Sequence, residues 1–150
     1  MRDQRYQLEA TPTFLSYEFT SEGSKGRIPK LVKYTVTSNP NVYNLGFGDK
    51  VGDTHDFDDK VISDNNDSAR VLATVAASLY TFTDNYPNIF VVATGSTPAR
   101  TRLYRIRISN IIEEIEQDFL VLGYLGTKWE IFEKNRDYSA FLIKRKIIIE

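Results

Sequence analysis

The 150-residue chain contains no cysteine and a single histidine, His55. The lack of cysteine excludes disulfide bonds, thiolate metal sites and a cysteine nucleophile, and it favours a reducing compartment such as the cytoplasm. Because there is one histidine, metal sites with two histidines and nucleases with a histidine pair are excluded too, and we expect His55 to be exposed in a loop. The residues predict no cofactor and leave open whether the protein is an enzyme.

Long apolar runs and an excess of charge of one sign are also lacking. No stretch reaches the roughly 18 apolar residues of a membrane span, and the N-terminus has no apolar run typical of a signal peptide. The formal net charge is −1, so no global field attracts nucleic acid or an anionic membrane. We expect a cytoplasmic protein without a membrane partner, folded as one domain over residues 1–150.

Three segments in the N-terminal third alternate between apolar and polar residues, as strands with one buried face do. They are residues 14–23, 27–36 and 42–49. The turn-like residues between the first two segments predict a hairpin. The N-terminal third is therefore expected to form an antiparallel sheet.

Two helices are expected in the middle of the chain. The apolar spacing becomes helical at residues 68–86, with Asp67 or Ser68 as a plausible N-cap and Pro87 just past the end. A second helix is expected from Pro98, a residue favoured at the first helical position. The apolar run at 88–94, between the helices, is sized for a central strand buried on both faces.

The C-terminal part returns to strand-like patterns at residues 119–126, 129–133 and 138–146, and the turn residues 134–137 predict a hairpin between the last two. The order β-β-β-α-β-α-β-β-β predicts an α+β domain, a mostly antiparallel sheet with two α-helices packed against it. The apolar tail at 146–150 has three interpretations: an edge strand, a dimer contact or a cloning remnant.

The second helix carries most of its apolar residues on one stripe that is expected to face the core. The stripe consists of Tyr104, Ile108, Ile111, Ile112, Ile115 and Phe119. Leu103 and Ile106 fall outside it. The helix's four arginines do not cluster on one side, because Arg102 is expected to face solvent while Arg105 and Arg107 flank the stripe. A continuous nucleic-acid-binding helix is therefore not indicated.

Arg100 lies in the first turn of this helix, where the helix dipole disfavours a cation. An external anion would offset that cost, because the strand-to-helix turn offers backbone donors, two hydroxyls and a guanidinium to one phosphate. The predicted ligand-binding residues are Gly95, Ser96, Thr97, Arg100, Arg102 and Arg105. Neither a P-loop nor a dinucleotide-binding motif is present. The alternative is that the hydroxyls only cap the helix and Arg100 pairs with an aspartate of the 49–67 segment.

The 49–67 segment contains seven aspartates and is expected to form a long loop. Carboxylates are the ligands that hard cations prefer, but the spacing lacks the pattern of an EF-hand. Runs of like charge are usually solvated loops. No metal site is expected.

Four stretches, VYNLGFGD, DDKVISDNNDSARVLATVA, GSTPARTRLYRIRI and WEIFEKNRDYSAFLIKRK, follow one another in this order. Together they resemble a family of small uncharacterised bacterial proteins, a domain of unknown function with a GSTxARTRLYR motif. The resemblance covers roughly residues 40–146. It implies a compact stand-alone bacterial domain with no established activity, so it assigns no catalytic residue.

Two functions follow as expectations. The first is a binding protein for a phosphate-bearing ligand, a nucleotide or RNA, at the turn before the second helix. The second is a protein-protein interaction module without ligand chemistry, either one half of a toxin-antitoxin or defence-type pair or a homodimer. Its motivation is the off-stripe position of Leu103 and Ile106 together with the apolar tail.

Overall fold

A computed structural model describes residues 5–58, 65–94 and 97–147. The chain divides into two compact units, the first made of Met1–Thr35 and Gly46–Tyr86 and the second of Val36–Leu45 and Pro87–Glu150. Strand β4 (Val42–Lys50) contributes residues to both units. The expectation of a single domain over 1–150 stays a prediction.

Among the described residues the sheet contains nine strands, hydrogen bonded in the order β1-β2-β3-β4-β6-β9-β7-β8, with β5 beside β4. The β4–β6 ladder is parallel, and the other ladders with a described register are antiparallel. Together with the two helices in the same part of the chain, this confirms the predicted α+β class and the predicted order of elements. Two strands of two residues each, β1 (Glu9–Ala10) and β5 (Phe57–Asp58), are added to that order.

The first unit begins with the predicted hairpin. Strand β2 (Ser16–Gly23) pairs with β3 (Gly26–Val36), and the register ends at the Gly23–Gly26 pair. Gly26 has a φ of 90°, a conformation that glycine adopts without strain. The two residues between the strands make a tight turn, as the sequence predicts.

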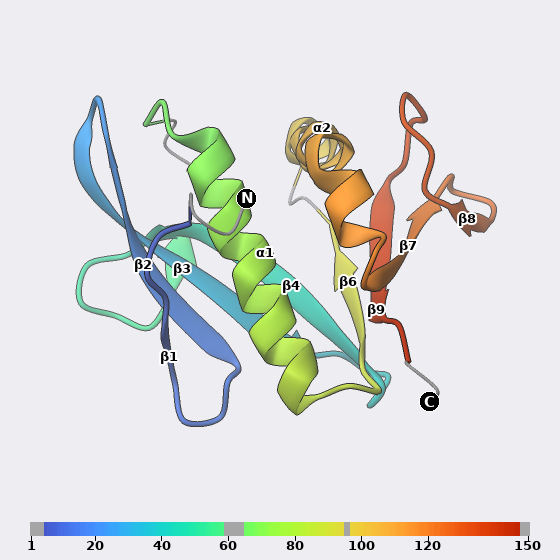
Figure 1. Ribbon diagram of the computed structural model, residues 1–150, viewed down its shortest axis with the longest axis horizontal. Helices are drawn as coiled ribbons and strands as arrows, with labels where there is room; N and C mark the ends of the chain where they lie inside the picture. The colour runs from blue at the N-terminus through green and yellow to red at the C-terminus, as the bar shows by residue number, and fades with distance from the viewer. Residues whose placement is uncertain (1–4, 59–64, 95–96, 148–150) are drawn as a thin grey trace. The chain divides into compact units, whose positions relative to one another are not determined.

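Helix α1 (Ser68–Asn85) lies against the strands of the first unit (Figure 1). It ends at Asn85, one residue short of the expected bound, and Pro87 lies beyond the end, as predicted. The ring of Tyr34 on β3 stacks on Phe82 of α1 at a centroid distance of 4.1 Å, and its hydroxyl lies 2.9 Å from the Ser78 hydroxyl. Stacked rings bury large apolar areas, so this contact joins helix and sheet in the core of the unit.

The second unit contains β6, α2 and the last three strands of the chain. Their bounds are β6 Phe90–Ala93, α2 Pro98–Ile115, β7 Phe119–Tyr124, β8 Trp129–Ile131 and β9 Ala140–Arg145. In Figure 1, α2 lies over one face of these strands. No helix in the described part of the chain is long and apolar enough to cross a membrane.

The hairpin predicted across residues 134–137 is wrong. Strand β7 lies between β8 and β9 and pairs with both, so the final two strands are not neighbours. The connecting segment is not a simple turn, because Phe132 and Tyr138 pack their rings against Phe141. The ring of Tyr138 lies over Gly123 of β7, whose missing side chain leaves room for it.

Strand β6 is a central strand, as predicted, but only one of its faces is buried. Val91 and Ala93 are buried, while Phe90 and Val92 on the opposite face are half-buried. An apolar run alone indicates burial without showing which side is covered. The expectation of burial on both faces is therefore wrong, and an apolar sheet face remains without a helix over it among the described residues of this unit.

The predicted stripe of α2 is only partly buried. Ile112 and Ile115 are buried, and the other apolar residues of the stripe within the helix are half-buried. The last stripe residue, Phe119, belongs to β7, because α2 ends at Ile115. Leu103 and Ile106 are exposed, as expected from their position outside the stripe.

Candidate functional site

The ligand site predicted at the start of α2 is only partly described. Gly95 and Ser96 lie outside the described residues, and of Arg100 only the backbone, in the first turn of α2, is described. Thr97 is exposed, and its carbonyl accepts a hydrogen bond from the Thr101 amide at 3.0 Å. Phosphate binding at this turn stays a prediction.

The two other arginines of the predicted ligand site, Arg102 and Arg105, differ in their surroundings. Arg102 is exposed, as predicted. Arg105 donates through Nη1 to the Arg136 carbonyl at 3.2 Å and to the Asp137 carboxylate at 3.0 Å. Arg105 therefore connects α2 to the segment between β8 and β9.

The aspartates of the 49–67 segment are dispersed rather than gathered. Asp49 lies at the end of β4 and pairs with the buried Lys30 at 2.5 Å, whereas Asp53 and Asp56 are exposed. His55 is exposed, as expected. Asp59 and Asp64 lie outside the described residues. Within the described parts of the chain, no group of three or more acidic, histidine or cysteine side chains is placed to hold a metal ion.

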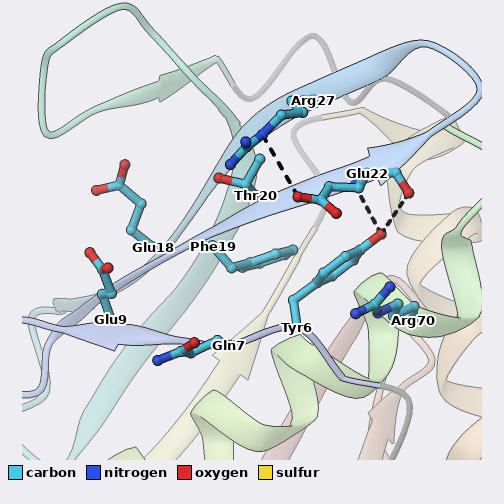
Figure 2. Close-up of a pocket in the computed structure, with 9 residues that line it drawn as sticks. All are labelled: Tyr6, Gln7, Glu9, Glu18, Phe19, Thr20, Glu22, Arg27 and Arg70. Carbon is cyan, nitrogen blue, oxygen red and sulfur yellow. Dashed lines mark hydrogen bonds and ion pairs between the residues drawn. The ribbon is translucent and has the colours of Figure 1, made fainter.

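The first unit has a recess of about 380 Å³ beside the N-terminal segment (Figure 2). Its lining residues are Tyr6, Gln7, Glu9, Glu18, Phe19, Thr20, Glu22, Arg27 and Arg70. The ring of Tyr6 lies between Phe19, at a centroid distance of 5.8 Å, and the Arg70 guanidinium, at 3.9 Å from the ring centroid. The contact with Arg70 is a cation–π interaction.

The hydroxyl of Tyr6 anchors the N-terminal segment to the rest of the first unit. It donates to the Asp67 carboxylate at 2.5 Å and accepts from the Glu22 amide at 2.9 Å. Burial, with Asp67 next, raises the pKa of Tyr6 above its ordinary value of 10.0. The hydroxyl therefore keeps its proton at neutral pH, and we assign it a structural role.

Asp67 occupies the N-cap position of α1, as one alternative of the sequence analysis has it, but its side chain makes no capping hydrogen bond. Its carboxylate accepts instead from Tyr6 and from the Ser21 hydroxyl, each at 2.5 Å. The neighbouring Asn65 is buried and bonds through its side chain to the Lys25 amide and the Gly26 carbonyl. These residues hold the β2–β3 turn against the start of α1.

The sheet face of the second unit that has no helix over it among the described residues carries exposed apolar side chains on β7 and β8. Along β7, Phe119 and Val121 are buried on one face, while Leu120 on the other face is 40% exposed. Trp129 and Ile131 of β8 lie opposite Tyr124 and Leu122, so they share the face of Leu120. They are 41% and 65% exposed.

Strand β8 is the last strand in the sheet order, so one of its edges faces away from β7. Two hydrogen bonds show which residues of β7 and β8 form hydrogen-bonded pairs: Leu125 N to Lys128 O and Phe132 N to Val121 O, each 3.0 Å. Because antiparallel pairs alternate along a ladder, Glu130 directs its backbone groups toward β7, and Trp129 and Ile131 direct theirs outward. The outer edge of β8 thus combines two apolar side chains with outward-facing backbone donors and acceptors.

Glu130 anchors this edge strand from its other face. Its carboxylate accepts from the buried Tyr138 hydroxyl at 2.7 Å and lies 2.9 Å from both Nε and Nη2 of Arg136. The hydrogen bond from Tyr138, followed by the charge of Arg136, lowers the pKa of Glu130 from 4.5. Glu130 is therefore ionised at neutral pH, and its contacts fix the position of β8.

Sequence reasoning missed this edge as a candidate site, although it predicted the strand. The signal is the alternation Trp129-Glu130-Ile131, which places two large apolar side chains on one face. Alternation does not show whether that face is covered. Only the end position of β8 in the sheet and the path of α2 show that it is open.

Comparison with known proteins places the chain in a family without assigning an activity. The family described as "Family of unknown function (DUF6934)" matches residues 2–146. This match begins much nearer the N-terminus than the stretches that carry the resemblance noted from the sequence. No curated protein and no solved structure matches the chain. Because the match covers nearly the whole length, the chain belongs to DUF6934, a family of unknown function.

Proposed function

We propose that this protein is a protein-protein interaction module that self-associates through the outer edge of β8. One observation carries the proposal: Trp129 and Ile131 of the end strand β8 and Leu120 of the neighbouring strand β7 are exposed on one face of the sheet. Exposed apolar edge strands are rare in monomers, because they invite pairing with another chain. Clusters of exposed apolar side chains also mark interaction surfaces, because soluble monomers rarely expose contiguous apolar patches.

The occupant that fits this edge is a second copy of the chain. The outward-facing residues of β8, Trp129 and Ile131, are two positions apart, and an antiparallel copy presents the same two positions. Each copy can therefore satisfy the other's outward backbone groups. Such a pairing has two-fold symmetry, the commonest symmetry of soluble oligomers.

The association is expected to be weak and reversible. Stable interfaces bury about 800 Å² per partner, and the described part of β8 contributes three residues. Strand addition supplies backbone hydrogen bonds, while side chains on alternate positions supply selectivity. A monomer–dimer equilibrium that depends on protein concentration is the expected behaviour.

Sedimentation equilibrium over a range of concentrations tests the proposal. Wild type should show a reversible dimer, and Ile131→Lys should stay monomeric, because a lysine on an edge strand replaces apolar contact area with a charge that has to stay hydrated. Val36→Lys is the matched control, since Val36 is a 74% exposed residue at the end of β3, and it should behave as wild type. A monomeric wild type at every concentration, or a dimer unaffected by Ile131→Lys, would overturn the proposal.

A second candidate is binding of a phosphate-bearing ligand, a nucleotide or RNA, at the turn before α2. It is supported by the first turn of this helix, which contains no acidic residue to neutralise the N-terminal amides. Thr97 and Ala99 are exposed, so a ligand can approach the backbone at this point, where Pro98 offers no N–H. The test of this candidate is a variant of Arg100.

A further inference from the structure

Two copies of β8 can pair in more than one antiparallel register, and the residues around β8 favour one of them. We infer that the two-fold axis of the dimer passes beside Glu130, and that the Glu130–Arg136 ion pair makes this register possible. The inference rests on the proposed function and goes beyond it by naming the register and the charged residues that determine it.

Three registers of two antiparallel β8 strands bring outward-facing residues together. A register centred on Glu130 pairs Trp129 of each copy with Ile131 of the other, which uses every outward backbone group of β8. A register centred on Trp129 would place Ile131 opposite Thr127, a residue of the bend that precedes β8. The first register forms two complete hydrogen-bonded pairs within regular strand, and the second forms one.

The third register, centred on Ile131, would place Trp129 opposite Glu133. The Glu133 amide already donates to the Tyr138 hydroxyl at 2.9 Å. Pairing there would therefore break a hydrogen bond of a buried hydroxyl, which costs more than an exposed bond. The register centred on Glu130 forms more complete pairs than the register centred on Trp129, and it leaves the hydrogen bond from Glu133 to Tyr138 intact.

This register brings two carboxylates together. The opposing Glu130 residues would form a non-hydrogen-bonded pair, with Cα atoms about 4.5 Å apart, and like charges in directly opposite positions destabilise a sheet. Each carboxylate, however, is bound at both oxygens by Arg136 of its own chain. The four charges at the axis therefore sum to zero.

Arg136 is held in place for this role by its own backbone. Its carbonyl accepts a hydrogen bond from Arg105 of α2, and Asp137 next to it pairs with the same guanidinium. The Arg136 side chain remains 43% exposed, so it can approach the second copy. We expect it to act as a register-determining residue, whereas the apolar side chains supply the contact area.

Cysteine cross-linking reads the register directly, because the chain has no cysteine of its own. Glu130→Cys should form a disulfide-linked dimer on mild oxidation, since disulfides need Cα atoms within about 7 Å. Trp129→Cys and Ile131→Cys should each fail to cross-link alone but should cross-link when mixed, because these positions pair with each other. Efficient cross-linking of either alone would overturn the register.

The role of Arg136 is tested by the dissociation constant of the dimer. Arg136→Gln leaves two carboxylates opposite each other and should weaken the dimer about fivefold at low salt. The double variant Glu130→Gln with Arg136→Gln should return to within about twofold of wild type, because the repulsion is gone. The matched control is Arg27→Gln, which removes an exposed ion pair with Glu22 in the first unit and should leave the dissociation constant unchanged.

The outcomes separate this inference from the proposed function. If wild type dimerises and Ile131→Lys abolishes the dimer, but Arg136→Gln lowers only the melting temperature, then Arg136 has a purely structural role and the inference fails alone. If wild type never dimerises, the proposed function and the inference fail together. Cross-linking in the predicted pattern together with rescue by the double variant supports both.

Discussion

Tyr138 lies across Gly123 so closely that a Cβ atom at position 123 would come within 2.4 Å of the tyrosine ring. Gly123 faces Glu130 in the β7–β8 register, and the Tyr138 hydroxyl binds the Glu130 carboxylate. Tyr138 therefore contacts both strands: its ring packs on Gly123 of β7, and its hydroxyl binds Glu130 of β8. The position of the edge strand β8 depends on these contacts.

Gly123→Ala should destabilise the protein by about 2 kcal/mol, because overpacking forces buried side chains away from their preferred positions. Chemical unfolding measures the loss. The double variant Gly123→Ala with Tyr138→Ala is the check, since removing the ring makes room for the new methyl group. Its loss should be clearly smaller than the sum of the two single losses, and additive losses would contradict the close approach.

Tyr6→Phe should destabilise the protein by about 2 kcal/mol, because Asp67 loses a charge-assisted hydrogen bond at a partly buried site. Thermal unfolding measures the change. Tyr86→Phe is the matched control, because its hydroxyl donates to the Thr13 carbonyl at an exposed position and should cost about 0.5 kcal/mol. Equal losses in the two variants would show that Tyr6 does not anchor the N-terminal segment.

Asp49→Asn should be strongly destabilising, by about 3 kcal/mol, because it leaves the ammonium of Lys30 buried without its carboxylate. Lys30 is 1% exposed, and Asp49 lies 2.5 Å from it. The control is Asp56→Asn, which breaks the exposed contact with Lys33 at 3.9 Å and should change stability by less than about 0.5 kcal/mol. Urea unfolding of both variants measures the loss in free energy of unfolding. Similar losses in the two variants would contradict a stabilising role of the buried Lys30–Asp49 pair.

Arg100→Ala tests the phosphate-ligand candidate. The variant should bind inorganic phosphate or a nucleotide about tenfold more weakly than wild type, as measured by titration calorimetry. The melting temperature of the free protein should stay at the wild-type value. Arg27→Ala, an exposed arginine of the first unit, is the control for a general loss of positive charge. A lower melting temperature without any change in binding would favour the alternative, in which Arg100 pairs with an internal carboxylate.

Local patterns predicted the elements well, because each depends on neighbours in the chain. The alternation in residues 14–36 predicted the first hairpin, and Pro87 predicted the end of α1, since a proline cannot continue a helix. The exposure of Leu103 and Ile106 followed from helical periodicity. In each case the deciding interaction spans a few residues.

The long-range contacts were not predictable in the same way. The sequence shows that Asp67 suits an N-cap, but its carboxylate binds Tyr6 and Ser21, which lie 61 and 46 residues away. The hairpin predicted at 134–137 failed because β8 and β9 both pair with β7. Turn residues indicate that a chain reverses, and they do not indicate which strand it pairs with next.

The sequence by itself determined the order of elements, the hairpin between β2 and β3, and the alternation of Trp129, Glu130 and Ile131, because periodicity and turn chemistry are local properties. The tertiary structure alone decided that β8 is the terminal strand, that α2 covers one face of the second unit, and that Glu130 is held by Tyr138 and Arg136. Those features depend on hydrogen bonds and burial between segments distant in the chain, and they determine which apolar residues stay exposed.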